Sequence, residues 1–395
     1  MPPQPPDFDQ ALTLHRQGRL AEAERLYRRI LRSAPTHFDA LHLLGTLAGQ
    51  TDRFDEALDL LNRALAQRPD SASALNNLGN TLGNLGRHRE AVQAFERALA
   101  VRPDDAKALR NRGTSLRALE LPMEALASFD AALALEPDYP EAVIGRAEAL
   151  LTLHRKAQAI EAFRQALPLG KDVEQIHYVL ASLGEEPAPA TAPPAYVEAL
   201  FDSYSQSFDQ HLVERLAYRT PELLVAELRA AGPRGDADVI DLGCGTGLCG
   251  PLLRPLARHL GGVDLSGLML ARARALGVYD ELVQADIAAA LAGPPQRLDI
   301  AVAADVFVYI GDLDAVFAAT AAALRQGGLF AFSVELCEDG ADIRLGATRR
   351  YAHAPAYLDR LAQAHGLQTL STHRCAIRKE GGADVDGLLA VLRRP

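Results

Sequence analysis

Residues 239–247 read VIDLGCGTG, an apolar run that passes into three glycines at alternate positions. The apolar run is typical of a short buried strand, and glycine lets the backbone turn tightly and approach a ligand closely. A helix that starts after such a loop leaves N–H groups of its first turn free for a ligand. The stretch therefore predicts a strand, a ligand-binding loop and a helix, in that order.

The glycine spacing separates this loop from two phosphate-binding loops. A dinucleotide fingerprint, GxGxxG, needs its third glycine at position 248, where the chain has Leu248. A P-loop needs a Gly-Lys-Ser/Thr ending, which the stretch lacks. Asp241, two residues before the first glycine, would repel a pyrophosphate and would suit a cationic amino group.

Two further acidic residues end predicted strands. Asp264 ends the second strand, 21 residues after Gly243, where a carboxylate can accept hydrogen bonds from both hydroxyls of a ribose. Asp286 ends the third strand, where it can accept from an adenine amino group. Ligands of parallel sheets lie beyond the carboxyl ends of the strands. These acids therefore predict an adenosine that carries an amino acid tail rather than a phosphate chain.

Outward from the loop, predicted strands and helices alternate. Strands are predicted at 239–242, 260–265, 282–285, 298–309 and 328–334, helices at 247–259, 268–276, 313–325 and 354–365, and an antiparallel pair at 374–379 and 387–392. This alternation predicts a doubly wound α/β fold, a parallel sheet with helices on both faces. Two helices are predicted within 196–231, the second with Thr220 as cap and Pro221 in its first turn.

Residues 196–395 resemble the class I S-adenosylmethionine-dependent methyltransferase family. VIDLGCGTG matches its first motif, GVDLS (262–266) its second and QADI (284–287) its third, while RQGG (325–328) replaces a Pro-Gly-Gly turn. The resemblance implies a Rossmann-like domain with S-adenosylmethionine as cofactor. It assigns Asp241, Gly243 and Gly245 to the methionine portion, Asp264 to the ribose, Asp286 and Ile287 to the adenine, and Leu265 and Met269 to the flanks of the adenine ring. Cys244 lies within the same loop, where we expect its small side chain to pack.

Methyl transfer from a sulfonium needs alignment and exclusion of water more than a fixed set of catalytic side chains. Catalytic candidates are therefore chosen by position. Tyr204, Phe208 and His211 recur at helical spacing in residues 200–224, a stretch that resembles the N-terminal lid of small-molecule members of the family. Tyr204 or His211 would close over the methionine end or orient the acceptor. The alternative is that all three side chains only pack the lid on the sheet.

Asp305 and Tyr309 lie in ADVFVYIGDL (304–313), where the family lines its acceptor pocket. An acid in an apolar strand is costly without a partner, which favours a site role for Asp305. Tyr351 and His353 are weaker candidates. Members that methylate nucleobases carry an (Asn/Asp)-Pro-Pro-aromatic motif after the fourth strand, and ADVFVY lacks it. The acceptor is therefore not expected to be a nucleobase.

The first half of the chain repeats every 34 residues. The registers are Pro35, Pro69, Pro103 and Pro137; Ala23, Ala57, Ala91, Ala125 and Ala159; Tyr27, Leu61, Phe95, Phe129 and Phe163; and Gly45, Gly79 and Gly113. A large side chain four residues after a small one lies on the same helical face, and proline ends the second helix. Each unit is thus predicted to be two antiparallel helices. The pattern resembles the tetratricopeptide repeat, with copies at 4–37, 38–71, 72–105, 106–139 and 140–173 and a capping helix at 173–183.

Such arrays usually bind peptides along their first helices. Asn77 and Asn111 occupy equivalent positions, and an amide offers both a donor and an acceptor to an extended chain. Together with Arg110 they are the candidate partner-binding residues. The alternative is that they are ordinary solvated polar residues.

The composition limits the remaining classes. A chain of 395 residues predicts two domains, here 4–183 and 196–395, with GEEPAPATAPPA (184–195) as a stiff linker. A net charge of −10 disfavours a nucleic acid partner. Four scattered cysteines predict neither disulfides nor a metal site. The N-terminus lacks the features of a secretory signal, and no run is long and apolar enough for a membrane span. The expected address is the cytoplasm.

Three functions remain open from the sequence. The leading one is a methyltransferase for an oxygen or nitrogen of a small or carrier-bound acceptor, with the repeats recruiting a protein partner. The second is a methyltransferase whose acceptor is a protein held by the repeats. The third is an adaptor that binds the cofactor without turnover.

Overall fold

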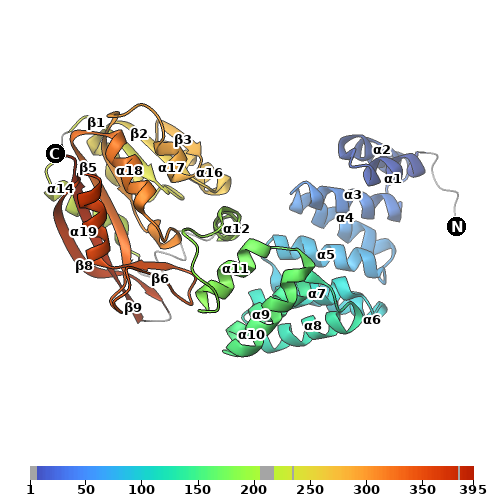
Figure 1. Ribbon diagram of the computed structural model, residues 1–395. Helices are drawn as coiled ribbons and strands as arrows, with labels where there is room; N and C mark the ends of the chain where they lie inside the picture. The colour runs from blue at the N-terminus through green and yellow to red at the C-terminus, as the bar shows by residue number, and fades with distance from the viewer. Residues whose placement is uncertain (1–6, 205–217, 234, 381–382) are drawn as a thin grey trace. The chain divides into compact units, whose positions relative to one another are not determined.

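The computed structural model describes residues 7–204, 218–233, 235–380 and 383–395. The chain divides into two compact units, Met1–Val173 and Glu174–Pro395. Blue to green helices form the first unit in Figure 1, and the sheet with its covering helices forms the second.

The described part of the first unit consists of helices in five consecutive pairs, as the period of 34 predicts. The pairs are α1 (Phe8–Arg16) and α2 (Leu20–Ser33), α3 (Phe38–Gln50) and α4 (Phe54–Gln67), α5 (Ala72–Asn84) and α6 (His88–Val101), α7 (Ala106–Ala118) and α8 (Pro122–Leu135), and α9 (Pro140–Thr152) and α10 (Lys156–Ala166). The expected copy boundaries fall in the turns between pairs.

Contacts between a glycine and an aromatic ring explain two of the sequence registers. A Cβ on Gly79 would lie 2.5 Å from the Phe95 ring, and a Cβ on Gly113 would lie 2.8 Å from the Phe129 ring. Both rings are buried. Glycine on the first helix therefore makes room for the large side chain of the second, and the two helices approach closely.

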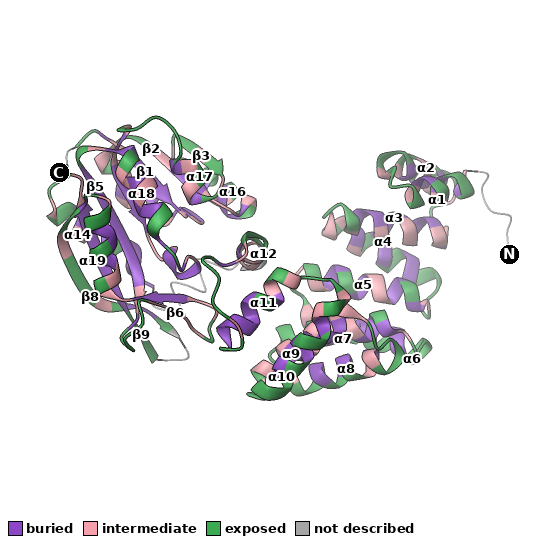
Figure 2. Ribbon diagram, viewed as in Figure 1, coloured by how far each residue is buried: buried purple, intermediate pink, exposed green. Residues whose placement is uncertain are grey.

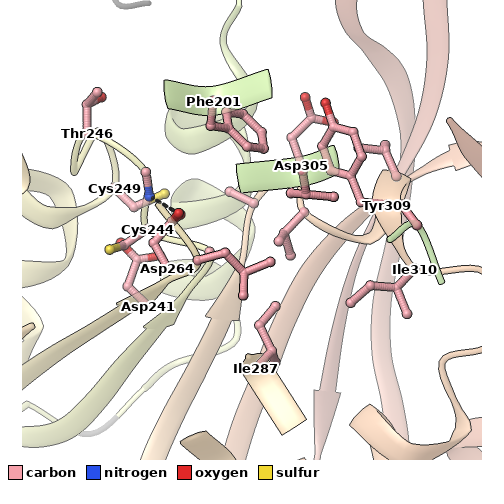
Figure 3. A pocket seen from close by; sticks show the side chains of 18 of the residues that line it. Phe201, Asp241, Cys244, Thr246, Cys249, Asp264, Ile287, Asp305, Tyr309 and Ile310 are labelled. Atoms are coloured by element: carbon pink, nitrogen blue, oxygen red, sulfur yellow. Dashed lines mark hydrogen bonds between the residues drawn. The ribbon is translucent and has the colours of Figure 1, made fainter. Parts of the chain in front are cut away.

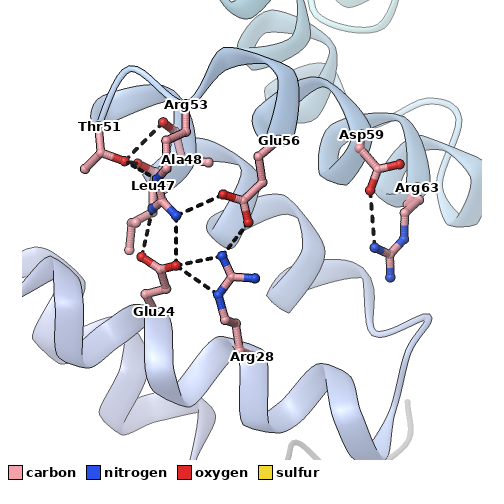
Figure 4. A network of polar contacts seen from close by, with 9 residues as sticks. All are labelled: Glu24, Arg28, Leu47, Ala48, Thr51, Arg53, Glu56, Asp59 and Arg63. Atoms are coloured by element: carbon pink, nitrogen blue, oxygen red, sulfur yellow. Dashed lines mark hydrogen bonds and ion pairs between the residues drawn. The ribbon is translucent and has the colours of Figure 1, made fainter.

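Charged side chains also join the first two repeats. The guanidinium of Arg53 donates to both carboxylate oxygens of Glu24 on α2, at 2.9 and 2.7 Å, and to Glu56 on α4 at 2.9 Å (Figure 4). Arg28 also bonds Glu24 and Glu56. These side chains are partly exposed. Each pair therefore adds about 1 kcal/mol or less, and the apolar helix contacts dominate stability.

The second unit is built on one sheet of nine strands, ordered β3-β2-β1-β4-β5-β7-β6, with β9 paired to β5 and β8. The strands are β1 (Ala237–Leu242), β2 (Ala257–Asp264), β3 (Glu281–Gln284), β4 (Leu298–Ala303), β5 (Leu324–Leu336), β6 (Ile343–Leu345), β7 (Tyr351–His353), β8 (Gln368–Glu380) and β9 (Ala383–Arg393). The strands β1 to β5 are parallel, and β8 and β9 form the expected antiparallel pair. The order reverses between β1 and β4, which is where such sheets bind ligands.

Helices cover both faces of this sheet. The helices of the second unit are α11 (Val173–Ser182), α12 (Pro194–Tyr204), α14 (Thr220–Ala230), α15 (Gly250–Leu253), α16 (Gly267–Ala275), α17 (Ile287–Leu291), α18 (Asp314–Ala323) and α19 (Pro355–Ala364). Phe330 and Phe332 pack toward α18 and α19, whereas the alternating Leu329 and Ala331 pack toward α14 and α15. The central strands β1, β4 and β5 are accordingly buried along most of their length, whereas β3 and β8 are largely exposed (Figure 2). The doubly wound fold is confirmed.

Several elements differ from the prediction in extent. The helix expected at 247–259 is only α15 and a 3-10 turn, Arg254–Leu256, because prolines interrupt it and β2 begins at Ala257. The strand expected at 298–309 ends at Ala303. Arg219, and not Thr220, occupies the N-cap position of α14, without a side-chain cap hydrogen bond, and the Thr220 hydroxyl donates to the Ile377 carbonyl at 3.0 Å. The sequence did not predict β6, β7 or α17.

The boundary between the two units also differs from the prediction. The helix expected to cap the repeats, α11, lies with the second unit, where Tyr178 packs against Val197, Tyr309 and Tyr351. The stretch expected to be a stiff linker is held to the same unit, since the Ala190 carbonyl accepts from Gly311 and Asp312. Large apolar side chains in α11 therefore serve the second core.

Candidate active site

A cavity opens at the carboxyl edge of the sheet, where the strand order reverses. Figure 3 shows Asp241, Cys244 and Asp264 on one side of it and Asp305, Tyr309 and Ile310 on the other. Phe201 of α12 and Ile287 of α17 lie between these two sides. The cavity thus has a glycine-loop end and an opposite end, which follows β4.

The glycine loop adopts the backbone that its glycines predict. Gly243, Gly245 and Gly247 have φ values of 66°, 54° and 94°, a region that side chains other than glycine rarely adopt. A Cβ on Gly243 would lie 2.3 Å from Val306, whereas a Cβ on Gly245 would meet no atom within 4 Å. Gly243 therefore permits close packing, and Gly245 borders open space.

Asp264 ends β2 and lines the cavity, as predicted. Its two oxygens accept hydrogen bonds from backbone N–H groups, Oδ2 from Gly245 at 2.9 Å and Oδ1 from Ser266 at 2.8 Å. Burial raises the pKa of Asp264, and these N–H groups oppose the rise. The carboxylate thus ties the glycine loop to the start of α16, and each oxygen retains a second lone pair for a ligand hydroxyl.

The residues predicted around the adenine divide into two groups. Asp286, Ile287 and Leu265 line the cavity. Oδ1 of Asp286 also caps α17, accepting from Ala288 at 2.8 Å. Met269 is fully buried in the first turn of α16 and is not one of the cavity-lining residues, so the structure does not place it where a ring-flanking contact was predicted.

Asp241 lies at the bottom of the glycine-loop end. It is 1% exposed, and its Oδ2 accepts from the Tyr279 hydroxyl at 2.6 Å. Burial raises the pKa of this carboxyl to about 7. Cys244 lines the cavity beside it, but its Sγ would lie 3.0 Å from a Cβ on Gly262, so the thiol packs on β2 as expected. Burial also raises the pKa of Cys244, which keeps it protonated.

The charges of the cavity decide which ligands fit it. The glycine-loop end presents Asp241, Asp264 and Asp286, and among the described lining residues the cations are Arg350 and Arg378. A phosphate chain beside three carboxylates would be repelled, whereas a cation with hydroxyl and amino donors would be stabilised. The glycine-loop end therefore suits a cationic ligand that carries hydrogen-bond donors.

Buried charges meet at the opposite end. The Arg378 side chain on β8 is 1% exposed, and its Nη1 donates to both oxygens of Asp305, at 3.1 and 3.3 Å. Its Nη2 donates to Glu335 on β5. Asp305 has a left-handed backbone, with φ of 56°, and its N–H donates to Ser333. Arg378 is thus the partner that the buried Asp305 requires, and its hydrogen bonds fix the position of the Asp305 carboxylate.

Tyr309 is the second predicted residue at this end. It is 9% exposed, and its ring meets Phe201 edge-on with centroids 5.4 Å apart. Burial raises the pKa of its hydroxyl, and the charge of Arg350 opposes that rise. A phenol in this state is protonated at neutral pH and acts as a hydrogen-bond donor. Asp305 and Tyr309 therefore both line this end of the cavity.

Five other candidates are not among the described residues that line the cavity. Tyr204 is the last residue of α12, and Phe208 and His211 lie outside the described residues. Tyr351 donates to the Pro189 carbonyl, and His353 bonds the Gly311 carbonyl through Nε2. Both are fully buried away from the cavity.

Sequence reasoning missed Arg378, Glu335, Tyr279 and the apolar wall formed by Phe201. Arg378 stands within the strand predicted at 374–379, but Arg374 and Lys379 lie in the same strand, so its charge did not single it out. Tyr279 lies between motifs and carries no spacing signal. Both reach the site through pairing of strands distant in sequence.

In the repeats, the candidate partner-binding amides contact neighbouring helices. Asn77 donates to His42 and Thr46 of α3, at 3.0 and 2.8 Å. Asn111 is 7% exposed and donates to Asn76 of α5 at 3.2 Å. The guanidinium of Arg110 donates to the Tyr139 hydroxyl and lies over its ring. These amide nitrogens thus link successive first helices.

The described residues contain neither a cluster of metal-binding side chains nor a helix that could span a membrane. No three His, Cys, Asp or Glu side chains lie close enough together to hold a metal ion. No described helix combines the length and the apolar character of a membrane span.

Comparison with known proteins gives the same two parts. Family models described as "Tetratricopeptide repeat" match residues 8–70, 38–104 and 111–173, and one described as "Methyltransferase domain" matches residues 239–328. Among solved structures, a TPR protein with an unusual peptide-binding site, YrrB, is 21% identical with a TM-score of 0.39, and the match covers 43% of this chain and 88% of that chain.

Two relatives with methyltransferase names match part of the chain. Methyltransferase-like protein 27 of Homo sapiens is 42% identical over 85 residues, which are 21% of this chain and 34% of the relative. Malonyl-[acyl-carrier protein] O-methyltransferase of Pseudescherichia vulneris is 32% identical over 137 residues, 35% of this chain and 52% of the relative. The chain therefore spans about a third of the first relative and about half of the second.

Proposed function

Because this chain joins tetratricopeptide repeats to a methyltransferase domain, we propose that it transfers a methyl group from S-adenosylmethionine to an oxygen or nitrogen of a small or carrier-bound acceptor. The observation that carries the proposal is the convergence of Asp241, Asp264 and Asp286 at the glycine-loop end of one cavity. Three carboxylates beside an open glycine loop suit a cationic nucleoside.

Each acid has a separate task in this proposal. Asp264 accepts from the ribose hydroxyls, and its bonds to Gly245 and Ser266 fix its orientation. Asp286 accepts from the adenine amino group, with Ile287 and Leu265 as apolar contacts for the ring. Asp241 pairs with the amino group of the methionine portion, the one cationic amine of the ligand.

The chain aligns the reactants and excludes water. S-adenosylmethionine, when bound, supplies an activated methyl group, so the protein need not generate a reactive species. Phe201 and Val197 of α12 place apolar surface over the cavity, which reduces competition from water. The side chains at the opposite end then hold an acceptor in line with the donor.

We assign the acceptor to the end formed by Asp305 and Tyr309. Asp305, fixed by Arg378, can accept a hydrogen bond from an acceptor O–H or N–H, and the protonated Tyr309 can donate one. The bacterial relative acts on a malonyl group borne by a carrier protein. That relationship favours a carrier-bound acceptor here.

A second candidate is methylation of a protein held by the repeats. Asn77 and Asn111 support it, because the amide of each uses its nitrogen within the array, and its oxygen could still accept from a peptide backbone. The third candidate, a binding adaptor, would need the same cofactor site but no turnover.

Transfer of labelled methyl from S-adenosylmethionine to metabolite, carrier-protein and cellular-protein fractions tests the proposal. The matched variants are Asp264→Ala, which removes the ribose acceptor, and Asn77→Ala with Asn111→Ala, which changes only the repeats. The leading function is supported if the metabolite or carrier fraction becomes labelled, if Asp264→Ala abolishes this label and if the asparagine variant retains it. Label in protein that the asparagine variant loses supports the second. No label in any fraction contradicts both and leaves the adaptor.

A further inference from the structure

Tyr279 lies between α16 and β3, outside every sequence motif, and its hydroxyl contacts Asp241, which lines the glycine-loop end of the cavity. It donates to Oδ2 of Asp241 at 2.6 Å. Among the described residues this is the one hydrogen bond to the Asp241 carboxylate, whose other oxygen, Oδ1, has no protein donor. The position of the tyrosine therefore determines how Asp241 is held.

Three glycines leave the space in which the Tyr279 ring packs. A Cβ on Gly247, Gly250 or Gly262 would lie 3.0, 2.7 or 3.0 Å from ring carbons of Tyr279. Gly247 ends the glycine loop, Gly250 begins α15 and Gly262 lies in β2. The backbone thus lacks a side chain at three positions around this ring. Gly247, the third glycine of the motif, therefore both permits the turn and leaves space for the ring.

The surroundings of Asp241 make the hydroxyl important. The carboxyl is 1% exposed, and the groups that face it are Asp264, Cys244, Cys249 and Tyr279. Burial keeps both thiols protonated, and Asp264 disfavours a second negative charge. Tyr279 alone favours the ionised form of Asp241, because a hydrogen bond to a carboxylate stabilises its charge.

We propose that Tyr279 is a positioning residue for the donor site, one that holds Asp241 as an ionised acceptor for the cationic amino group of the donor. The inference rests on the proposed function. Tyr279 itself does not line the cavity, so it acts through Asp241 and not by touching the ligand.

The consequence is a pH-dependent affinity. Asp241 titrates near neutral pH because burial raises its pKa to about 7. Without the hydroxyl the carboxyl would be protonated at pH 7, and a neutral acid pairs weakly with an ammonium group. We expect Tyr279→Phe to weaken binding of S-adenosylhomocysteine about 10-fold at pH 7, the size of one hydrogen bond to a charged group. At pH 8.5, where more of the carboxyl ionises, the loss should shrink to about 3-fold or less.

Calorimetric titration of the full chain with S-adenosylhomocysteine at pH 6, 7 and 8.5 tests this. The matched control is Tyr357→Phe, since Tyr357 also donates to an aspartate, Asp312 at 3.2 Å, but lies outside the cavity. A double-mutant comparison adds Asp241→Asn, in whose background Tyr279→Phe should have no further effect. Thermal unfolding of each variant verifies that it is folded.

The outcomes separate this inference from the proposed function. If the wild type binds no S-adenosylhomocysteine at any pH, the proposed function fails. If the wild type binds and Tyr279→Phe equals it at every pH, or is weakened equally at every pH, the positioning role is wrong. Should Tyr279→Phe not fold, Gly250→Ala displaces the ring by adding a Cβ 2.7 Å from it. A folded Gly250→Ala variant with wild-type affinity at pH 7 would likewise overturn the inference.

Discussion

Asp241 shows how one buried carboxyl can link binding to stability. Its pKa is raised to about 7 by burial, whereas a carboxyl of the unfolded chain titrates near 4. The folded chain binds this proton more tightly, so its stabilising effect is full below about pH 4 and is lost as the pH rises through about 7. A shift of about 3 pKa units corresponds to on the order of 4 kcal/mol.

We therefore predict that the free energy of unfolding of the unliganded chain falls between pH 5 and pH 8, and that Asp241→Asn removes much of this fall. Urea titrations at each pH measure it. Asp264 and Glu335, whose pKa values burial also raises, remain in both proteins and cancel in the comparison. Parallel pH curves for variant and wild type would contradict this assignment.

The pair of acids around Arg378 predicts a large loss of stability when the guanidinium is removed. Arg378→Met leaves Asp305 and Glu335 as half-buried carboxylates without their cation, which costs about 3 kcal/mol. The control is Arg374→Met on the same strand, because Arg374 pairs with Glu338 at a fully exposed position and should change stability by less than about 0.5 kcal/mol. Equal effects in chemical denaturation would show that the buried cluster is not held by Arg378.

Sequence motifs located some residues of the cavity and missed others. Gly243, Asp264 and Asp286 lie at strand ends inside short motifs, so local spacing was enough to place them at the cavity. Arg378 lines the same cavity, and Tyr279 contacts its Asp241, only because strand pairing brings β8 and the segment before β3 there. No local pattern encodes that pairing. Met269 followed the motif but is buried away from the cavity, since its turn of α16 packs inward.

Helix pairs follow directly from periodicity, and α5 allows a matched test of their packing. Gly79→Ala should destabilise the repeats by about 1–3 kcal/mol, because its Cβ would lie 2.5 Å from the Phe95 ring and overpack a close contact. Gly83→Ala on the same helix meets only Ser115 at 3.8 Å and should raise stability by up to about 1 kcal/mol. Thermal unfolding of the repeat unit measures both. Similar shifts for the two variants would mean that Gly79 is not a packing position.

The strand end and the helix that the sequence predicted wrongly have the same physical cause. The strand predicted to reach Tyr309 stops at Ala303 because Asp305 takes a left-handed backbone, which an alternating apolar pattern does not reveal. The helix α11 was assigned to the repeats because it follows them in sequence, but its Tyr178 packs into the second core and donates to the Arg349 carbonyl at 2.7 Å. Contacts between distant residues decide both cases.

For the whole molecule, the boundary after Val173 predicts how the chain can be divided. A fragment of residues 174–395 should unfold at a higher temperature than one of residues 196–395, because the shorter fragment loses Tyr178 and Ala192 from an apolar cluster. Differential scanning calorimetry of both fragments measures this. Equal unfolding temperatures would mean that α11 and the stretch after it add nothing to the second unit. The cytoplasmic location of the whole chain stays a prediction.

We infer that the second unit binds an adenosine donor with a cationic tail. Calorimetric titration with S-adenosylhomocysteine measures this binding directly, and NAD is the control ligand. The three carboxylates at the glycine-loop end predict stoichiometric binding of S-adenosylhomocysteine, no binding of NAD, and loss of the former in Asp264→Ala. Binding of NAD instead, or of neither ligand by a folded protein, would contradict the account.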